Sequence, residues 1–271
     1  MIANILSIAG TDPSGGAGIQ ADLKAISACH GYGMSVITCL VAQNTQGVQA
    51  SLPIPTKFIA QQLTSLLEDV RIDAIKIGML GTADIIEAVY EQVKDLKIPL
   101  VLDPVMVAKS GHRLLEEKAL QALLETLLPL ATLITPNLPE AADLLRRKEA
   151  TSLKEVEIQG KMLLELGAQA VLMKGGHLNK SEKSTDILIT PDKVLAIADE
   201  RWKTKNTHGT GCSLSASIAT FLGQGKSLSE AVLEAKKWLN HAIKHADLLK
   251  VGKGCGPVHH FHALWKEEER R

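Results

Sequence analysis

The feature that most constrains the fold is an alternation of short apolar segments with longer amphipathic ones. The short segments are rich in Val, Ile and Leu and show no polar alternation, so we expect strands covered on both faces. They lie at residues 5–9, 35–41, 74–78, 100–105, 133–136 and 171–174. Helical patterns separate them, for example at 17–29 and 56–70. Repetition of strand, helix and strand predicts a mainly parallel α/β sheet with helices on both faces.

The pattern changes after the last of these strands. The segment 185–202, TDILITPDKVLAIADERW, has two β-type runs around Pro191-Asp192 and predicts a hairpin. Helical patterns follow at 212–222 and 229–246. We find no linker, repeat or low-complexity segment. The expected architecture is one domain over 1–271, a three-layer α/β/α fold with the hairpin as an antiparallel edge.

Composition excludes several classes of function. The chain of 271 residues has 30 basic and 30 acidic side chains and only 3% aromatic residues, which argues against nucleic acid as a partner. No apolar run approaches the roughly 20 residues of a membrane helix, and the start lacks the basic region of a signal peptide. The four cysteines have no metal-ligand spacing. We therefore expect a reduced cytoplasmic protein without a membrane partner.

Distinctive residues, most of them polar, follow nearly every predicted strand. Ligands of an open parallel sheet bind beyond the carboxyl ends of its strands, so these residues are expected to converge. They are Gly10, Gln43, Met79, Asp103, Asn137, Glu140 and Lys174. The sequence therefore predicts an active site at this edge of the sheet.

Three of these residues suit phosphoryl transfer. Lys174, before two glycines, supplies a positive charge beside backbone that a phosphate can approach. Asp103 and Glu140 are hard oxygen ligands suited to Mg²⁺. Each residue also has a structural explanation: a strand end for Asp103, a first-turn dipole partner for Glu140, a solvated side chain for Lys174. Their joint placement at one edge favours the functional interpretation.

The segment NTHGTGCSLSASIA joins a glycine-rich turn to a helix expected from Cys212. Gly209, Thr210 and Gly211 would present backbone N–H donors at the positive end of that helix, where phosphate binds. The same position lowers the pKa of a thiol, so Cys212 is either a reactive thiolate or a buried, inert cysteine. Near the start, GTDPSGGAG matches neither the P-loop nor the dinucleotide-binding fingerprint.

Seven ordered motifs resemble a known family: AGTDPSGGAGIQADLK, VAQNTQGV, KIGML, DPVMVAKSG, TPNLPEA, MKGGH and THGTGCSLSA. They are similar to the hydroxymethylpyrimidine and phosphomethylpyrimidine kinases of thiamine biosynthesis, in the ribokinase-like superfamily. The likeness extends to GPVHHFHALW near the end of the chain. It implies a kinase that uses ATP and Mg²⁺. It would phosphorylate 4-amino-5-hydroxymethyl-2-methylpyrimidine and then convert the monophosphate to the diphosphate.

The resemblance also implies residue roles. Gln43 would hydrogen-bond the aminopyrimidine edge, for which a carboxamide offers both a donor and an acceptor. Met79 and Val105 would pack against the ring. The remaining roles implied are a pocket segment with Gly10, Ala17 and Asp22, ATP binding by Lys174 and Asn137, and metal binding by Asp103 and Glu140. Cys212 stands where the superfamily has an aspartate base and would accept the hydroxyl proton.

Two other functions stay open. A pyridoxal or pyridoxine kinase, alone or as a side activity, is the nearer alternative. Ser110, where some pyridoxal kinases have a second cysteine, favours the pyrimidine kinase. The other is a catalytically silent vitamin-binding protein, against which the intact Lys174, Glu140 and Cys212 argue. His259, His260 and His262 have no metal-site spacing, so surface or packing roles are expected. The expected partners are the pyrimidine, its phosphate and ATP, and the expected assembly is a homodimer.

Overall fold

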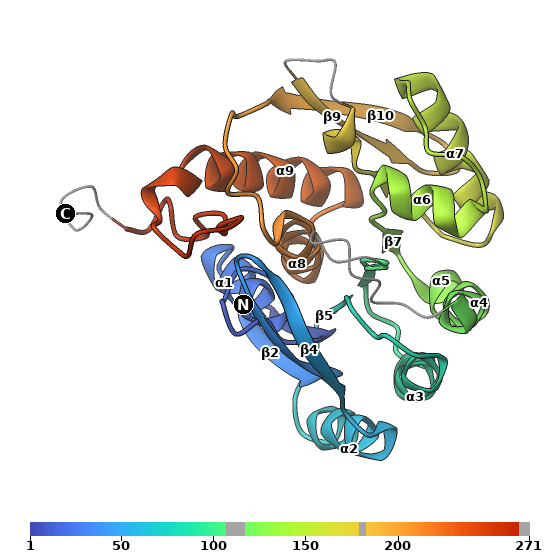
Figure 1. The fold of residues 1–271 in the computed structure, drawn as a ribbon. Coiled ribbons are helices and arrows are strands. Elements are labelled where there is room, and N and C mark those ends of the chain that lie inside the picture. Colours follow the sequence, from blue (N-terminus) through green and yellow to red (C-terminus); the bar gives the residue numbers. More distant parts are fainter. Residues whose placement is uncertain (107–116, 179–182, 266–271) are drawn as a thin grey trace.

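The computed structural model describes residues 1–106, 117–178 and 183–265, and their central sheet runs through the whole structure (Figure 1). Within these residues the sheet has the strand order β10-β9-β8-β7-β6-β5-β1-β2. The strands are β1 (Asn4–Ala9), β2 (Tyr32–Ile37), β5 (Ala74–Ile77), β6 (Leu100–Leu102), β7 (Leu133–Ile134), β8 (Val171–Met173), β9 (Lys183–Ile189) and β10 (Val194–Glu200). Pairing is parallel from β2 to β8 and antiparallel for β9 with β8 and β10. The predicted parallel sheet and its edge hairpin are confirmed.

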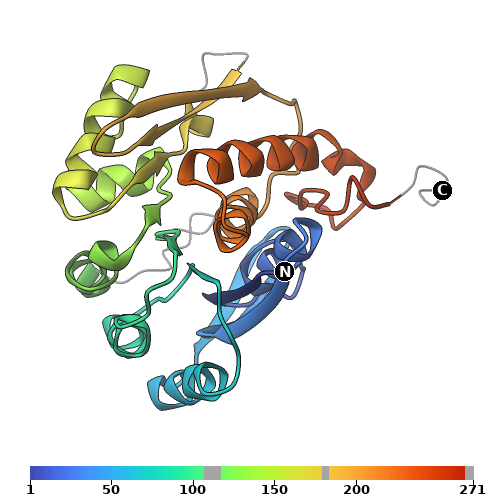
Figure 2. The same cartoon turned by 180° about the vertical axis from the view of Figure 1, so that it is seen from behind.

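Helices cover both faces of this sheet, which gives the predicted three layers (Figures 1 and 2). One face carries α2 (Thr56–Leu67), α3 (Ala83–Val93), α4 (Glu117–Glu125), α5 (Leu127–Leu130), α6 (Leu138–Leu145) and α7 (Leu153–Glu165). The other carries α1 (Gly18–Ala28), α8 (Thr210–Gly223) and α9 (Leu228–Lys244). Successive strand residues enter opposite cores: Leu100 and Leu102 face the first set of helices and Val101 the second. All three are buried, which explains the unbroken apolar runs of the sequence.

Helix α8 lies in the middle of its layer and is made of small residues. Every residue from Ser213 to Thr220 is buried, and the helix contacts α1, α9, β1, β5 and β6. The buried hydroxyls of Ser215, Ser217 and Thr220 donate to carbonyls of the preceding turn, as Thr220 Oγ1 does to the Ala216 oxygen at 2.8 Å. Small side chains thus let the helix approach the sheet closely and fix where its N-terminus points.

One predicted strand is wrong. Residues 35–41 span the end of β2 and the start of β3 (Cys39–Asn44), which pairs antiparallel with β4 (Gly47–Pro53) in a separate two-stranded sheet. The chain leaves the main sheet at Thr38, whose hydroxyl donates to the Met79 carbonyl at 2.7 Å. Gln43 is therefore carried by a hairpin that projects from the sheet edge, not by the end of a central strand.

In the described part of the chain, no helix is both long enough and apolar enough to cross a membrane.

Candidate active site

Two cavities open at the carboxyl edge of the sheet and share part of one wall. The hairpin cavity, of about 490 Å³, lies beside β3 and β4 and reaches the N-terminus of α8. The α9 cavity, of about 420 Å³, is bounded by the end of β10 and the side of α9. Residues that line both are Asn137, Lys174, Thr207, Thr210 and Gly211. Two ligands held separately would thus meet at Lys174 and the first turn of α8.

The hairpin cavity gathers most of the residues that the sequence singled out. Its lining includes Gly10, Ala17, Gln43, Met79, Val105, Asp103, Asn137, Glu140, Lys174 and the segment from Gly209 to Cys212. They come from seven places along the chain that lie at one sheet edge, as the strand-end argument predicts. The lid-like stretch with Ser110 lies outside the described residues.

Asp22 does not line either cavity, contrary to its predicted place in the pocket. It is fully buried on α1, where its Oδ2 accepts from Ser7 Oγ at 2.6 Å and from Lys76 Nζ at 2.7 Å. Lys76, on β5, does line the hairpin cavity. Burial, the largest single effect, would lower the pKa of Lys76, but the nearby acidic groups, Asp22 first among them, together hold this pKa above its usual range. Asp22 thus contacts the cavity lining through its ion pair with Lys76.

Lys174 is held between two carboxylates at the junction of the cavities. Its Nζ lies 2.8 Å from Asp103 Oδ1 and 3.8 Å from Glu140 Oε2. Asp103 also accepts from Thr135 Oγ1 at 2.9 Å. Burial by itself would raise the pKa of Asp103, but Lys174 and Lys76 hold it below its usual range. The ammonium is therefore paired on a side chain that is only partly exposed, which argues against the solvated lysine considered as an alternative.

Glu140 has a structural task as well as a place in the cavity. Its Oε2 accepts from the Asn137 N–H at 2.8 Å, while its own N–H donates to Asn137 Oδ1 at 2.9 Å, which forms the capping box of α6. Burial raises the pKa of Glu140 to about 7, although Lys174 opposes that shift. The pKa of this carboxyl is thus shifted toward neutral pH, whereas that of Asp103 is shifted away from it.

The first turn of α8 approaches Lys174 closely because two positions are glycine. Gly209, the N-cap, has φ of 75°, in the left-handed region that glycine adopts without strain. A Cβ at Gly211 would lie 3.3 Å from Lys174 Nζ and 3.5 Å from Asp103 Oδ2. The N-terminal N–H groups of α8 and the lysine ammonium therefore face one small volume, which suits a transferring phosphoryl group.

Cys212 lines the hairpin cavity in this same turn, but its thiol is not activated as the helix position suggests. Burial raises the pKa of Cys212 to about 11, and Asp22 and Asp103 add to the rise. Lys76 and the Gly18 N–H act in the opposite direction without reversing it. Burial thus acts against the stabilisation of a thiolate that is expected at the helix N-terminus.

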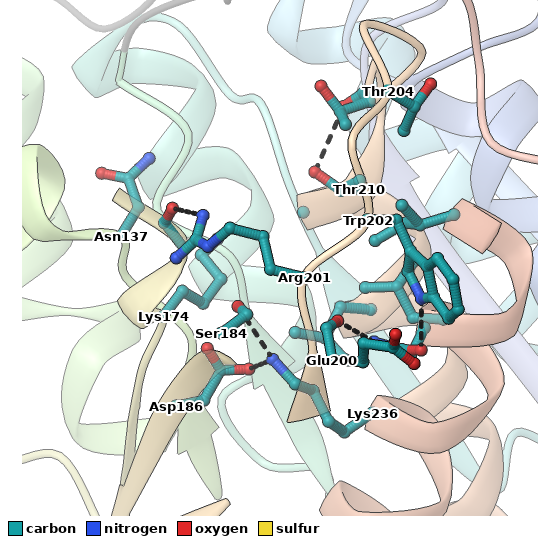
Figure 3. Close-up of a pocket in the computed structure, with 17 residues that line it drawn as sticks. Asn137, Lys174, Ser184, Asp186, Glu200, Arg201, Trp202, Thr204, Thr210 and Lys236 are labelled. Atoms are coloured by element: carbon teal, nitrogen blue, oxygen red, sulfur yellow. Dashed lines mark hydrogen bonds and ion pairs between the residues drawn. The ribbon is translucent and has the colours of Figure 1, made fainter. Parts of the chain in front are cut away.

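Four polar residues that line the α9 cavity were not predicted from the sequence, namely Asp186, Trp202, Lys236 and Asn240 (Figure 3). Lys236 Nζ lies 2.6 Å from Asp186 Oδ2, and Asp186 Oδ1 accepts from the Gly175 N–H at 2.9 Å. Trp202 Nε1 donates to Asn240 Oδ1 at 2.8 Å. Asp186 directly precedes the apolar run Ile187–Ile189, and this is the signal in the sequence that could have pointed to it, since a buried carboxylate requires a partner.

The three histidines near the chain end serve packing. His259 and His260 are buried, and His260 Nε2 lies 2.8 Å from Ser213 Oγ, which fastens the C-terminal segment to α8. The described residues contain no cluster of three or more His, Cys, Asp or Glu arranged for a metal ion. Of the two roles expected from their spacing, packing is confirmed for His259 and His260, since both side chains are buried and neither lies at the surface.

The fold is that of a ribokinase-like kinase. The ADP complex of Bacillus subtilis pyridoxal kinase matches with a TM-score of 0.90 at 38% identity, over 98% of this chain and 100% of that one. Phosphomethylpyrimidine kinase from Clostridium difficile 630 matches with a TM-score of 0.78 at 40% identity, over 89% of this chain and 99% of that one.

Sequence comparisons give the particular family. The hydroxymethylpyrimidine/phosphomethylpyrimidine kinase of Salmonella typhimurium is 55% identical over 263 residues, which cover 97% of this chain and 98% of that protein. The family model described as phosphomethylpyrimidine kinase matches residues 12–259. The chain belongs to the phosphomethylpyrimidine kinase family.

Proposed function

We propose that the protein is the ATP-dependent kinase that phosphorylates 4-amino-5-hydroxymethyl-2-methylpyrimidine and then its monophosphate, in thiamine biosynthesis. The observation that carries this proposal is the shared wall of the two cavities at Lys174 and Gly211. A nucleotide in the α9 cavity would direct its terminal phosphate toward an acceptor in the hairpin cavity. The 55% identical relative of the same name supports the choice of acceptor.

In the hairpin cavity, the proposed pyrimidine contacts are Gln43 for the polar edge of the ring and Met79 and Val105 for its faces. Glycine at position 10 lets the Met79 side chain approach closely, since a Cβ there would lie 3.2 Å from Met79 Sδ. The hydroxymethyl group would then point to Cys212 and the first turn of α8. Lys174 would neutralise charge on the phosphoryl group in transit, with the α8 N–H groups as additional donors.

Cys212 is the proposed acceptor of the hydroxyl proton in the first reaction. Cys212 lines the cavity beside Gly211, which supports this role. Because the pKa of the thiol is raised, the thiolate would be present in only a small fraction of molecules, or would form during the reaction. Lys76 lowers the pKa of Cys212 and is the cation that would stabilise a thiolate there.

Mg²⁺ fits the donor set of the junction. Asp103 Oδ1 is engaged by Lys174 and Thr135, but Oδ2 faces the space beside Gly211, and Glu140 lines the same cavity. Two carboxylates with substrate phosphates and water are the usual protein environment of this ion. Bound there, Mg²⁺ would offset the negative charge of the nucleotide phosphates.

The function is tested by incubating the purified protein with ATP and either the hydroxymethylpyrimidine or pyridoxal, followed by mass analysis of the products. We expect the pyrimidine mono- and diphosphate. Efficient phosphorylation of pyridoxal with no pyrimidine product would replace the proposal by its alternative.

We also propose that residues 1–271 act as one domain, form a homodimer and work in the cytoplasm. One sheet that takes strands from Asn4 to Glu200 supports the single domain. Exposed apolar side chains on the edge strand β2 and on the hairpin, Tyr32, Leu40 and Leu52, support self-association. Light scattering would measure the mass.

A further inference from the structure

The two proposed reactions place different demands on the hairpin cavity. The first acceptor ends in a neutral hydroxymethyl group, whereas the second brings a phosphate that carries nearly two negative charges at neutral pH. The cavity wall already contains carboxylates, namely Asp103, Glu140 and Asp143. A group that favours the second acceptor must therefore offset charge that the first acceptor does not bring.

Both lysines that line this cavity already form ion pairs with carboxylates. Lys76 pairs with Asp22 at 2.7 Å, and Lys174 pairs with Asp103 at 2.8 Å at the junction with the α9 cavity, where the transferring phosphoryl group is expected. The remaining basic side chain among the described lining residues is His208. It directly precedes Gly209, the N-cap of α8.

The orientation of the His208 ring is fixed on two sides. Its Nε2 lies 2.8 Å from Asp12 Oδ2, and a Cβ at Gly16 would lie only 2.5 Å from its Cδ2. Its backbone N–H donates to the Gly256 carbonyl at 3.0 Å. Within the described residues, Nδ1 has no hydrogen-bond partner. The edge formed by Nδ1 and Cε1 is thus turned away from both Asp12 and Gly16, on a side chain that is 17% exposed.

Asp12 determines which nitrogen of the ring carries a proton. This buried carboxylate accepts from the Ser14 hydroxyl at 2.7 Å, the Gly16 N–H at 3.1 Å and the Ala17 N–H at 2.7 Å. Burial opposes ionisation, but the hydrogen bonds from His208 and Ser14 hold the pKa of Asp12 below its usual range. An ionised carboxylate only accepts, so Nε2 donates to it, and Nδ1 can donate when the ring is protonated.

We propose that His208 binds the phosphate of the monophosphate acceptor through Nδ1 and thereby gives the second phosphorylation its specificity. The proposal rests on the proposed function. In the second reaction a phosphate oxygen of the acceptor forms a bond to the γ-phosphorus of ATP. The bond from that phosphorus to the β–γ bridging oxygen breaks, and its electron pair leaves with ADP. The attacking oxygen carries no proton, so the histidine holds the phosphate and transfers nothing.

Three variants separate this role from a purely structural one. His208→Gln places an amide nitrogen near the position of Nε2 and keeps a donor for Asp12, but it lacks a group at Nδ1. His208→Asn places an amide near Nδ1 and is too short for Asp12. His30→Asn is the control, because His30 is exposed and its φ of 63° suits asparagine.

The kcat/KM values for the alcohol and the monophosphate are measured separately, and thermal unfolding checks each fold. We expect His208→Gln to lower the monophosphate-to-alcohol ratio of kcat/KM by about ten- to hundredfold, mainly through KM, which is the usual effect of one charged hydrogen bond. His208→Asn should retain more of this ratio, and His30→Asn all of it. An unaltered ratio in His208→Gln would overturn the proposal, because His208 would then only connect two loops.

A measurement on the unaltered protein covers the case in which the variants do not fold. The imidazole ¹⁵N signal of His208 Nδ1 should shift with the monophosphate and much less with the alcohol. Equal shifts would refute the phosphate contact. Failure of the proposed function is distinct, since the unaltered protein would then phosphorylate neither pyrimidine.

Discussion

Cys212 distinguishes the two phosphorylations, because only the first requires a proton to leave the attacking oxygen. The hydroxymethyl group must lose its proton, whereas a phosphate monoester with a second pKa of about 6 is already ionised at neutral pH. If Cys212 is the base, Cys212→Ala should slow phosphorylation of the alcohol by roughly 10²–10⁴-fold, the usual contribution of a general base. Phosphorylation of the monophosphate should change by no more than a few-fold.

The structure also fixes the pH dependence of this effect. With a pKa of about 11, which burial raises, Cys212 is thiolate in on the order of one molecule in 10⁴ at pH 7. An acid whose pKa is raised is deprotonated only as the pH rises toward that value. The kcat/KM for the alcohol should therefore climb about tenfold per pH unit between about pH 7 and 10. Cys212→Asp should lose this slope, because a carboxylate titrates well below that range.

Initial rates with each pyrimidine, measured separately across this pH range, provide the assay. Iodoacetamide labelling of Cys212 without substrate reports the thiol pKa independently of turnover. Cys29→Ala is the matched control, since Cys29 is a buried thiol outside both cavity linings. An alanine variant at 212 that stays within a few-fold of the parent on the alcohol would refute the base. So would equal losses in both reactions.

Three further outcomes follow from the buried charges and the ring contact. Lys76→Met should lower the free energy of unfolding by about 3–5 kcal/mol in denaturant titrations, because it leaves the buried carboxylate of Asp22 without its ion-pair partner. The additional substitution Asp22→Asn should recover most of that loss. Glu140, with a pKa raised to about 7 by burial, should bind Mg²⁺ less well as the pH falls below 7. Glu140→Gln should then show a weak Mg²⁺ requirement that no longer varies with pH, and a parental pH dependence in this variant would exclude Glu140 as a ligand. Gln43→Leu should weaken calorimetric binding of the hydroxymethylpyrimidine by about 1–3 kcal/mol, since the polar ring edge loses its partner, and unchanged affinity would remove Gln43 from the site.

The parallel sheet and its active edge could be predicted because both depend on local patterns. Uninterrupted apolar runs such as the one that contains Val101 identify strands covered on both faces. Once the strands are parallel, their carboxyl ends share one edge, so Asp103 and Lys174 were expected on the same side of the sheet. Their 2.8 Å contact also depends on the strand order, in which β7 alone separates β6 from β8. The hairpin of β3 and β4 could not be predicted in this way, because the apolar run continues past the point where Thr38 leaves the sheet.

The ion pair of Lys76 and Asp22 could not be predicted from the sequence for a different reason. The two residues lie 54 positions apart, and no local pattern states that a lysine in the strand AIKI and an aspartate on the buried face of α1 will meet at 2.7 Å. The sequence does show that each charged residue stands in an apolar segment, which is unusual because an unpaired lysine or aspartate is almost never fully buried. To predict that these two residues form an ion pair, one must know the spatial order of the strands and helices, which the structure supplies.

The protonation of Cys212 depends on two effects of unequal size, and only one can be predicted from the sequence. A helix N-terminus stabilises a nearby negative charge by about 0.3–1 kcal/mol, and up to ~2 kcal/mol in partly buried sites, which is at most about 1.5 pKa units. Full burial can raise the pKa of an acid by about 3–5 units. The GTGC motif predicts the smaller effect, whereas the larger one depends on the packing of α8 against the sheet and on the nearby Asp22 and Asp103. A thiolate at this position would be destabilised by the negative charge of the nucleotide phosphates. It must therefore be stabilised by nearby cations such as Lys76, which lowers the pKa of Cys212.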